Sequence, residues 1–170
     1  MISYTTEVQQ TDRQLLLSRI LRAPRELVWE AFTQPEHIAQ WWGPKGWQAT
    51  VHEMDVRVGG VWRYSFRGVG QETGQERWVK ATYQKVTKPE ELIYLNEFTD
   101  ESGIPLPGES SAGLVTASFK DLGQQTELVA TIAFPTTAAL AQAINMGTVR
   151  GTTETWDRLE QYLAVKIKEI

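Results

Sequence analysis

The sequence predicts an α+β domain in which a curved antiparallel sheet of seven strands wraps around a long C-terminal helix. Three observations indicate this class. Apolar and polar residues alternate through most of residues 48–134, as in strands with one buried face. Gly, Pro and Asp interrupt the alternation at short intervals, so consecutive strands run antiparallel. Apolar residues then recur at spacings of three and four from Thr137 to Lys168, which indicates one helix of about 30 residues.

The composition limits the classes of function. The chain of 170 residues is 41% hydrophobic and 22% charged, which suits one folded domain. It has no cysteine and two histidines, so disulfides, thiolate ligands and a histidine-rich metal site are excluded. A formal net charge of -4 argues against a nucleic-acid-binding surface. We expect neither a metal nor a cofactor.

The N-terminus and the hydropathy predict where the protein resides. No apolar run reaches the roughly 20 residues that cross a bilayer, and residues 1–7 lack the charged and apolar regions of a secretory signal. We therefore expect a cytoplasmic protein with no membrane span. Residues 1–12 are polar and show no periodicity, which predicts a flexible arm before a single domain at residues 13–170.

The domain is expected to open with a strand and two short helices. Arg13–Arg22 is rich in Leu and Ile and stops at a proline, which predicts a strand. Pro24 suits the first turn of a helix, and apolar residues follow it at helical spacing up to Phe32. Pro35–Trp42 is predicted to form the second helix, which ends before the next Gly-Pro pair.

Six strands are predicted to follow the short helices. Gln48–Arg57 and Val61–Arg67 flank Gly59-Gly60, a dipeptide able to supply the positive φ angles of a tight hairpin turn. The connection Asp100–Gly113 is rich in Gly, Pro and Ser, and we predict that it is a mobile flap. The other predicted strands are Glu76–Thr87, Glu91–Thr99, Ala112–Asp121 and Gln125–Phe134.

The parity of each strand predicts which side chains face inward. In the second strand of the hairpin one face carries Trp62, Tyr64 and Phe66, whereas the other carries Arg and Ser, so the aromatic face should point inward. An apolar face with a few polar groups is typical of a small-molecule pocket. The same parity places four more residues inward: His52, Met54, Tyr94 and Phe98.

Two questions stay open at this point. Gly147 and Gly151 lie one turn apart on the apolar stripe of the last helix, and their missing side chains favour a ligand space, a close helix–sheet contact or a bend. The aromatic rows form either a pocket or a solid core, and composition alone favours the core. Trp41, Trp42 and Trp47 either guard the mouth of such a pocket or, as we favour, plug the open end of the sheet.

Several strings of residues resemble one known family. They are Ala23–Trp29, Pro35–Ile38, Trp41–Pro44 and Arg57–Gly60, together with the tail from Gly147 to Leu163. These strings and the order of the elements resemble the helix-grip fold of the START-like (SRPBCC) superfamily, in the branch related to the activator of heat-shock protein 90 ATPase. The resemblance implies a deep cavity between the curved sheet and the last helix, suited to a hydrophobic or amphipathic ligand such as a lipid.

Three functions are compatible with these features. The favoured one is binding of a hydrophobic or amphipathic small molecule without catalysis. The second is an enzyme of the cyclase or dehydratase type that uses His52, Tyr64 or Tyr94 as acid or base. The third, from the resemblance only, is a partner of heat-shock protein 90, and a homodimer is compatible with each. The residues expected to bind the ligand are His52, Met54, Trp62, Tyr64, Phe66, Tyr94, Phe98, Ile144, Gly147, Gly151, Thr155 and Trp156.

Overall fold

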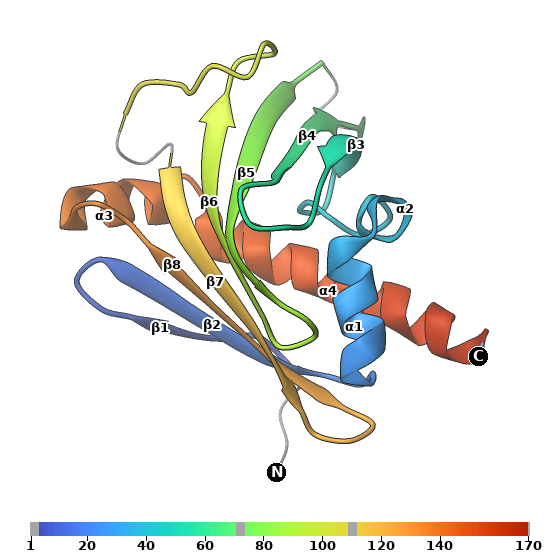
Figure 1. Ribbon diagram of the computed structural model, residues 1–170. Coiled ribbons are helices and arrows are strands. Elements are labelled where there is room, and N and C mark those ends of the chain that lie inside the picture. The colour runs from blue at the N-terminus through green and yellow to red at the C-terminus, as the bar shows by residue number, and fades with distance from the viewer. Residues whose placement is uncertain (1–3, 71–73, 109–111, 170) are drawn as a thin grey trace.

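One antiparallel sheet of eight strands curves around the C-terminal helix (Figure 1). The computed structural model describes residues 4–70, 74–108 and 112–169. Within these residues the strand order is β1-β2-β8-β7-β6-β5-β4-β3. The strands are β1 (Glu7–Gln10), β2 (Gln14–Leu21), β3 (Trp47–Met54), β4 (Val61–Gly68), β5 (Glu76–Thr87), β6 (Glu91–Thr99), β7 (Ala112–Asp121) and β8 (Thr126–Ala133).

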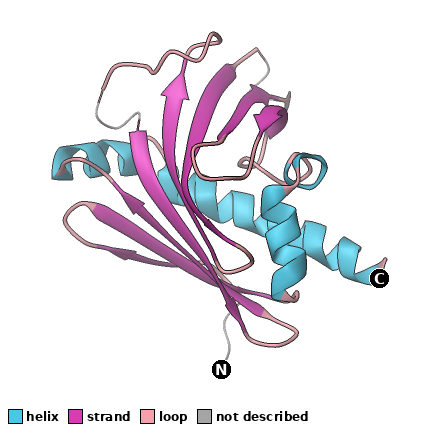
Figure 2. Ribbon diagram, viewed as in Figure 1, coloured by secondary structure: helices cyan, strands magenta, loops and turns pink. Residues whose placement is uncertain are grey.

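Two helices follow β2, and two close the described chain. They are α1 (Arg25–Thr33), α2 (Pro35–Ile38), α3 (Thr137–Asn145) and α4 (Thr148–Lys168). In Figure 2, viewed as in Figure 1, α4 runs across the sheet, with β1 and β2 on one side of it and β3 and β4 on the other. This arrangement confirms the predicted α+β class and helix-grip fold. The second helix is shorter than predicted, because it ends at Ile38 rather than at Trp42.

The predicted number of seven strands is wrong, because residues within the expected arm form β1. Its residues pair with β2, with Glu7 opposite Ser18 and Gln10 opposite Leu15. All four residues of β1 are exposed, so the strand has no buried face to produce an alternating pattern. Residues 1–3 of the expected arm lie outside the described part of the chain.

The predicted unbroken C-terminal helix is also wrong, because it is divided into α3 and α4. Gly147 precedes α4 and adopts a left-handed conformation with φ of 98°. Its backbone N–H donates to the carbonyl of Ile144 over 3.0 Å and so ends α3. Glycine has no Cβ to oppose this conformation. Of the interpretations considered for Gly147, the structure supports the bend.

The connection between β3 and β4 differs from the predicted two-residue turn. β3 ends at Met54 and β4 begins at Val61, so residues 55–60 form the connection. Gly59 has a positive φ of 82°, whereas Gly60 does not. Gly60 is instead required by close packing, since a Cβ there would lie 2.0 Å from the carbonyl oxygen of Asp55.

The hydrophobic core lies between the concave face of the sheet and the helices. From α4 it receives Trp156, Leu159 and Leu163, each at most 4% exposed. Burial of one such side chain contributes about 1.5–3 kcal/mol, so this contact is a main source of stability. The fully buried partners from the sheet and α1 include Leu17, Val28, Trp62, Tyr83, Phe119 and Leu128.

Candidate functional site

A cluster of aromatic rings covers the concave face at β4. Trp62 and Tyr64 are each 2% exposed, which confirms that this face points inward. The Trp62 and Tyr64 ring centroids are 4.5 Å apart, and those of Tyr64 and Phe66 are 5.1 Å apart. Trp42, from the segment after α2, places its ring centroid 4.8 Å from that of Trp62. The rings therefore contact one another, and they fill much of the space expected to be a deep cavity.

Polar atoms within this cluster lack hydrogen-bond partners. In the described part of the chain, three atoms of this face are shielded from solvent and have no hydrogen-bond partner: Trp62 Nε1, Tyr83 OH and Asn96 Oδ1. The side chain of Trp42 hydrogen-bonds with Tyr64. The other unpaired buried atoms belong to charged side chains: Arg19 Nε, Arg25 Nε and Glu160 Oε2. Leaving one buried polar group unpaired costs about 1–3 kcal/mol, so native proteins have few of them. Three such atoms on one face indicate a place where hydrogen bonds can be made to another molecule.

The buried tyrosines of this face resist ionisation. Burial raises the pKa of Tyr64, and the nearby phenol of Tyr94 raises it further, whereas side-chain hydrogen bonds with Trp42 and Asn96 lower it. Burial is also the main reason that the pKa values of Tyr83 and Tyr94 are raised. These phenols are neutral at physiological pH, so they can donate and accept hydrogen bonds but cannot act as anionic bases.

The raised pKa values predict a loss of stability in alkali. The unfolded chain ionises its tyrosines near pH 10, whereas the fold keeps Tyr64, Tyr83 and Tyr94 neutral. Their contribution is therefore complete below about pH 10 and is lost as the pH rises further. Tyrosinate absorbance and circular dichroism, followed together, should show these three tyrosines ionising only as the fold is lost. Ionisation of all five tyrosines with the dichroism unchanged would contradict this assignment.

A hollow of about 410 Å³ lies beside the aromatic cluster, where the ends of β5 and β6 face α3. Phe98 lies in its lining, two residues beyond Asn96 on the same strand. The described part of the predicted flap contributes to the same wall, and the N–H of Leu106 donates to the carbonyl of Phe98 over 2.9 Å. Residues 109–111 of that flap lie outside the described part. The lining includes Arg77, Phe98, Leu106, Pro107, Gln142 and Met146.

A second hollow, of about 640 Å³, lies at the turn between β1 and β2. Its lining comes from residues 11–14 together with Ala133 and Phe134. Most of these side chains are polar and exposed, and the buried aromatic cluster does not line this hollow. The hollow beside Phe98 is therefore the better candidate for a ligand site.

The prediction that His52 faces inward is wrong. The pairing of β3 with β4 shifts register between Val51 and Glu53, so the strict alternation of side chains fails at His52. Its exposed ring stacks on Trp78, with ring centroids 4.6 Å apart, and its Nε2 lies 2.8 Å from Ser65 Oγ. His52 thus lies on the outer face, away from the aromatic cluster.

The other predicted residues are brought together only in part. Met54 pairs with Trp62, and both pack against the core. Thr155 is buried, but its hydroxyl donates to the carbonyl of Gly151 over 2.7 Å, which satisfies its own hydrogen-bonding need. The predicted residues in or against the core also include Tyr64, Phe66, Tyr94, Phe98, Ile144 and Trp156. A ligand role for any of the predicted residues stays a prediction.

Two residues that bear unpaired atoms were not among the residues expected to bind the ligand. Asn96 shares the parity of Tyr94 and Phe98, so the alternation of β6 was a signal for it. Tyr83 lies in β5, where apolar residues occupy both parities, and the pattern alone did not assign its face. Its pairing with Tyr94 places the two residues side by side.

One arginine fixes the tryptophan-rich segment over the end of the sheet. Arg158 of α4 donates through Nη1 to the carbonyl of Gly43 over 2.7 Å and to that of Trp47 over 3.0 Å. Weaker contacts reach the carbonyls of Trp42 and Gln40. Residues 40–47 are thereby held against α4, and the Trp42 indole contacts that of Trp62 edge to face.

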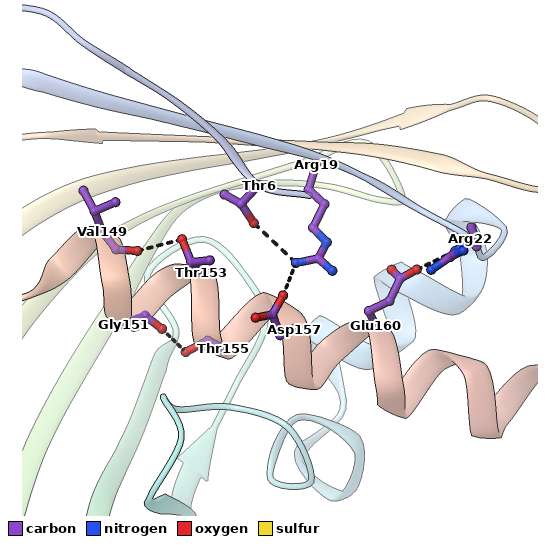
Figure 3. Close-up of polar contacts among 9 residues, drawn as sticks. All are labelled: Thr6, Arg19, Arg22, Val149, Gly151, Thr153, Thr155, Asp157 and Glu160. Atoms are coloured by element: carbon purple, nitrogen blue, oxygen red, sulfur yellow. Dashed lines mark hydrogen bonds and ion pairs between the residues drawn. The ribbon is translucent and has the colours of Figure 1, made fainter. Parts of the chain in front are cut away.

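Two ion pairs hold the opposite side of α4 to β2 and the residue after it (Figure 3). Arg19 donates to Asp157 over 2.6 Å and to the hydroxyl of Thr6 over 3.4 Å. Arg22 donates to Glu160 over 2.9 Å. α4 is therefore tethered along both of its flanks, which fixes the distance between helix and sheet around the aromatic cluster.

The curved sheet, the C-terminal helix and the aromatic concave face define a START-like domain with the helix-grip fold. Residues 22–164 match the family model described as activator of Hsp90 ATPase homolog 1-like protein. The chain belongs to this family. A comparison with curated proteins finds no match. Among the described residues, no helix is long and apolar enough to cross a membrane, and no group of three potential metal ligands occurs.

Solved structures share the fold along nearly the whole chain. The crystal structure of protein Ms6760 from Mycobacterium smegmatis is 22% identical, with a TM-score of 0.84 over 93% of this chain and 96% of that one. A solution structure from Arthrobacter aurescens, also 22% identical, has a TM-score of 0.86 over 93% and 91% of the two chains. One from Staphylococcus epidermidis is 27% identical, with a TM-score of 0.79 over 94% of each chain.

Proposed function

We propose that this protein binds a hydrophobic or amphipathic small molecule between the sheet and the C-terminal helices. The observation that carries the proposal is the set of three unpaired polar atoms on an otherwise aromatic face. Apolar walls with a few polar anchors are the usual make-up of small-molecule sites. The hollow beside Phe98 provides the entrance in this proposal. The cytoplasmic location expected from the sequence remains part of the proposal, and a homodimer stays compatible with it.

The enzymatic alternative loses its principal candidate residue. His52 lies on the outer face and is paired with Ser65, so it is not available as an acid or base on the concave side. The tyrosines that remain have raised pKa values and are poor bases. The role as a partner of heat-shock protein 90 is supported by the family description alone, and we keep it outside the proposal.

Filling the hollow should weaken binding without unfolding the protein. Gln142 is an exposed residue of α3 that lines the hollow, so Gln142→Trp places an indole at the entrance. We expect at least a tenfold increase in the Kd of the neutral apolar dye Nile red, measured by fluorescence titration, with little change in the urea midpoint. Tenfold corresponds to about 1.4 kcal/mol.

The matched control is Gln161→Trp, at an exposed position of α4 that does not line the hollow. It should leave the Kd of the dye unchanged. Equal effects of the two substitutions would show that the dye binds elsewhere. Failure of the wild-type protein to bind the dye, together with the absence of any co-purified compound in native mass spectrometry, would contradict the proposed function.

A further inference from the structure

The unpaired atoms of the concave face form a set with a definite chemistry. The indole nitrogen of Trp62 can only donate a hydrogen bond, whereas Asn96 Oδ1 can only accept hydrogen bonds. The hydroxyl of Tyr83 can do both. A molecule that satisfies the set must therefore offer an acceptor to the indole of Trp62 and a donor to the amide oxygen of Asn96. A hydroxyl group offers both.

The pairing of the strands brings these atoms to one part of the sheet. Trp62 pairs with Ala81 on β5, and Ala81 pairs with Asn96 on β6, so the indole and the amide flank a methyl group in one row. Tyr83 lies two residues beyond Ala81 on the same strand. Ala81 has the smallest of these side chains. It therefore leaves a depression in the row between the donor of Trp62 and the acceptor of Asn96.

No arginine described below lies beside the row formed by Trp62, Ala81 and Asn96. Arg19 pairs with Asp157 and its Nε has no partner, but it lies on β2, which β8 and β7 separate from β6. Arg158 donates to backbone carbonyls of residues 40–47. Arg77 is exposed at the rim of the hollow, with its guanidinium 5.8 Å from the centre of the Trp47 ring. A buried carboxylate at the row would have no cation beside it.

An unpaired anion in such a place is strongly disfavoured, because burial removes its hydration. The resistance of Tyr64, Tyr83 and Tyr94 to ionisation reports the same property of this face. Two properties of the row thus indicate the same type of ligand. They are the chemistry of its hydrogen-bond donors and acceptors and the distribution of charge around it.

We propose that the inner end of the ligand is an uncharged group with a hydroxyl function, such as an alcohol, a phenol or a sterol, and that Asn96 accepts its hydrogen bond. This inference rests on the proposed function and narrows it to a chemical class. The ligand's hydroxyl oxygen accepts from an indole N–H, and its apolar body extends towards the hollow beside Phe98. A fatty-acid anion of the same length is bound more weakly.

The test compares three displacers of Nile red on the intact protein at mildly alkaline pH. They are decan-1-ol, decanoate and methyl nonanoate, an uncharged ester of similar size that accepts hydrogen bonds but donates none. Decan-1-ol should displace the dye at a concentration at least tenfold lower than decanoate. Because a carboxylate is also better hydrated than an alcohol, the decisive comparison is between the alcohol and the ester.

Asn96→Leu should affect the two uncharged displacers differently. It removes the acceptor, so the displacing concentration of decan-1-ol should rise at least fivefold, whereas that of methyl nonanoate should change less than twofold. The control is Gln84→Leu, an exposed amide on β5, which should change neither value. Asn96→Ala serves the same comparison if the leucine variant fails to fold.

Each other outcome contradicts a stated part of the proposal. If decanoate displaces best and Arg77→Met abolishes its advantage, the polar end is an anion held at the rim, and the inference is wrong although the protein still binds ligands. If Asn96→Leu or Asn96→Ala raises the displacing concentrations of alcohol and ester equally, Asn96 does not accept a hydrogen bond from the ligand's hydroxyl. If no dye binds to the wild-type protein, the proposed function itself fails, and the inference fails with it.

Discussion

Gly60→Ala is expected to lower the free energy of unfolding by about 3 kcal/mol, because overpacking at a site that cannot relax costs in this range. The added Cβ would lie 2.0 Å from the carbonyl oxygen of Asp55 and 3.0 Å from that of Arg57. Both are backbone atoms of the same turn, so no side chain can move aside. The turn also bonds to β5, where the N–H of Tyr83 donates to the carbonyl of Gly60 over 3.0 Å.

Gly59→Ala is the matched control for this prediction. Its Cβ would meet no atom within 4 Å, and the cost is limited to the positive φ of 82°. We expect a loss of about 1 kcal/mol. Urea unfolding followed by tryptophan fluorescence measures both variants. A loss for Gly60→Ala no greater than that for Gly59→Ala would mean that the turn opens without cost.

Arg158→Met is expected to lower the free energy of unfolding by about 2 kcal/mol, since a hydrogen bond from a charged donor contributes about 1.5–3 kcal/mol and this side chain is partly exposed. Methionine keeps much of the apolar stem but leaves the carbonyls of Gly43 and Trp47 without their donor. Because residues 40–47 carry Trp42, the loss should also release that indole from Trp62. A red shift of tryptophan emission in the folded variant would report this release.

Two further variants make the Arg158 prediction specific. Arg158→Lys restores the charge but has one nitrogen in place of the planar fork, so it should recover less than half of the lost stability. Arg150→Met removes another arginine of α4, whose side chain is 85% exposed and pairs only with Glu154 among the described residues. That change should cost less than about 0.5 kcal/mol. Equal losses at the two positions would exclude a special role of Arg158.

The sequence predicted those elements whose side chains alternate between core and solvent. In β4 the residues Trp62 and Tyr64 point inward and Arg63 points outward, and the period of two follows directly from the pleat of the strand. β1 was missed because all four of its residues are exposed, which leaves no alternation to detect. A strand could therefore be predicted where one of its faces is buried.

Departures from regular geometry account for the errors in the site. A register shift in β3 turned His52 to the outer face, and no residue type in that strand indicates such a shift. Gly147 was expected within the last helix, but whether it left space or made a bend depended on its φ angle, which the sequence does not contain. The pairing of Trp62, Ala81 and Asn96 across three strands required the register of the whole sheet.

The two outermost strands of the open sheet affect how the protein behaves at high concentration. An unprotected edge exposes backbone N–H and carbonyl groups that recruit strands from other molecules and promote aggregation. Here β1 offers four residues, and β3 is interrupted by its register shift, so neither edge presents a long regular row. Growth of the sheet from one molecule to the next is therefore disfavoured at both ends, and the chain can keep an open β-layer without closing it into a barrel.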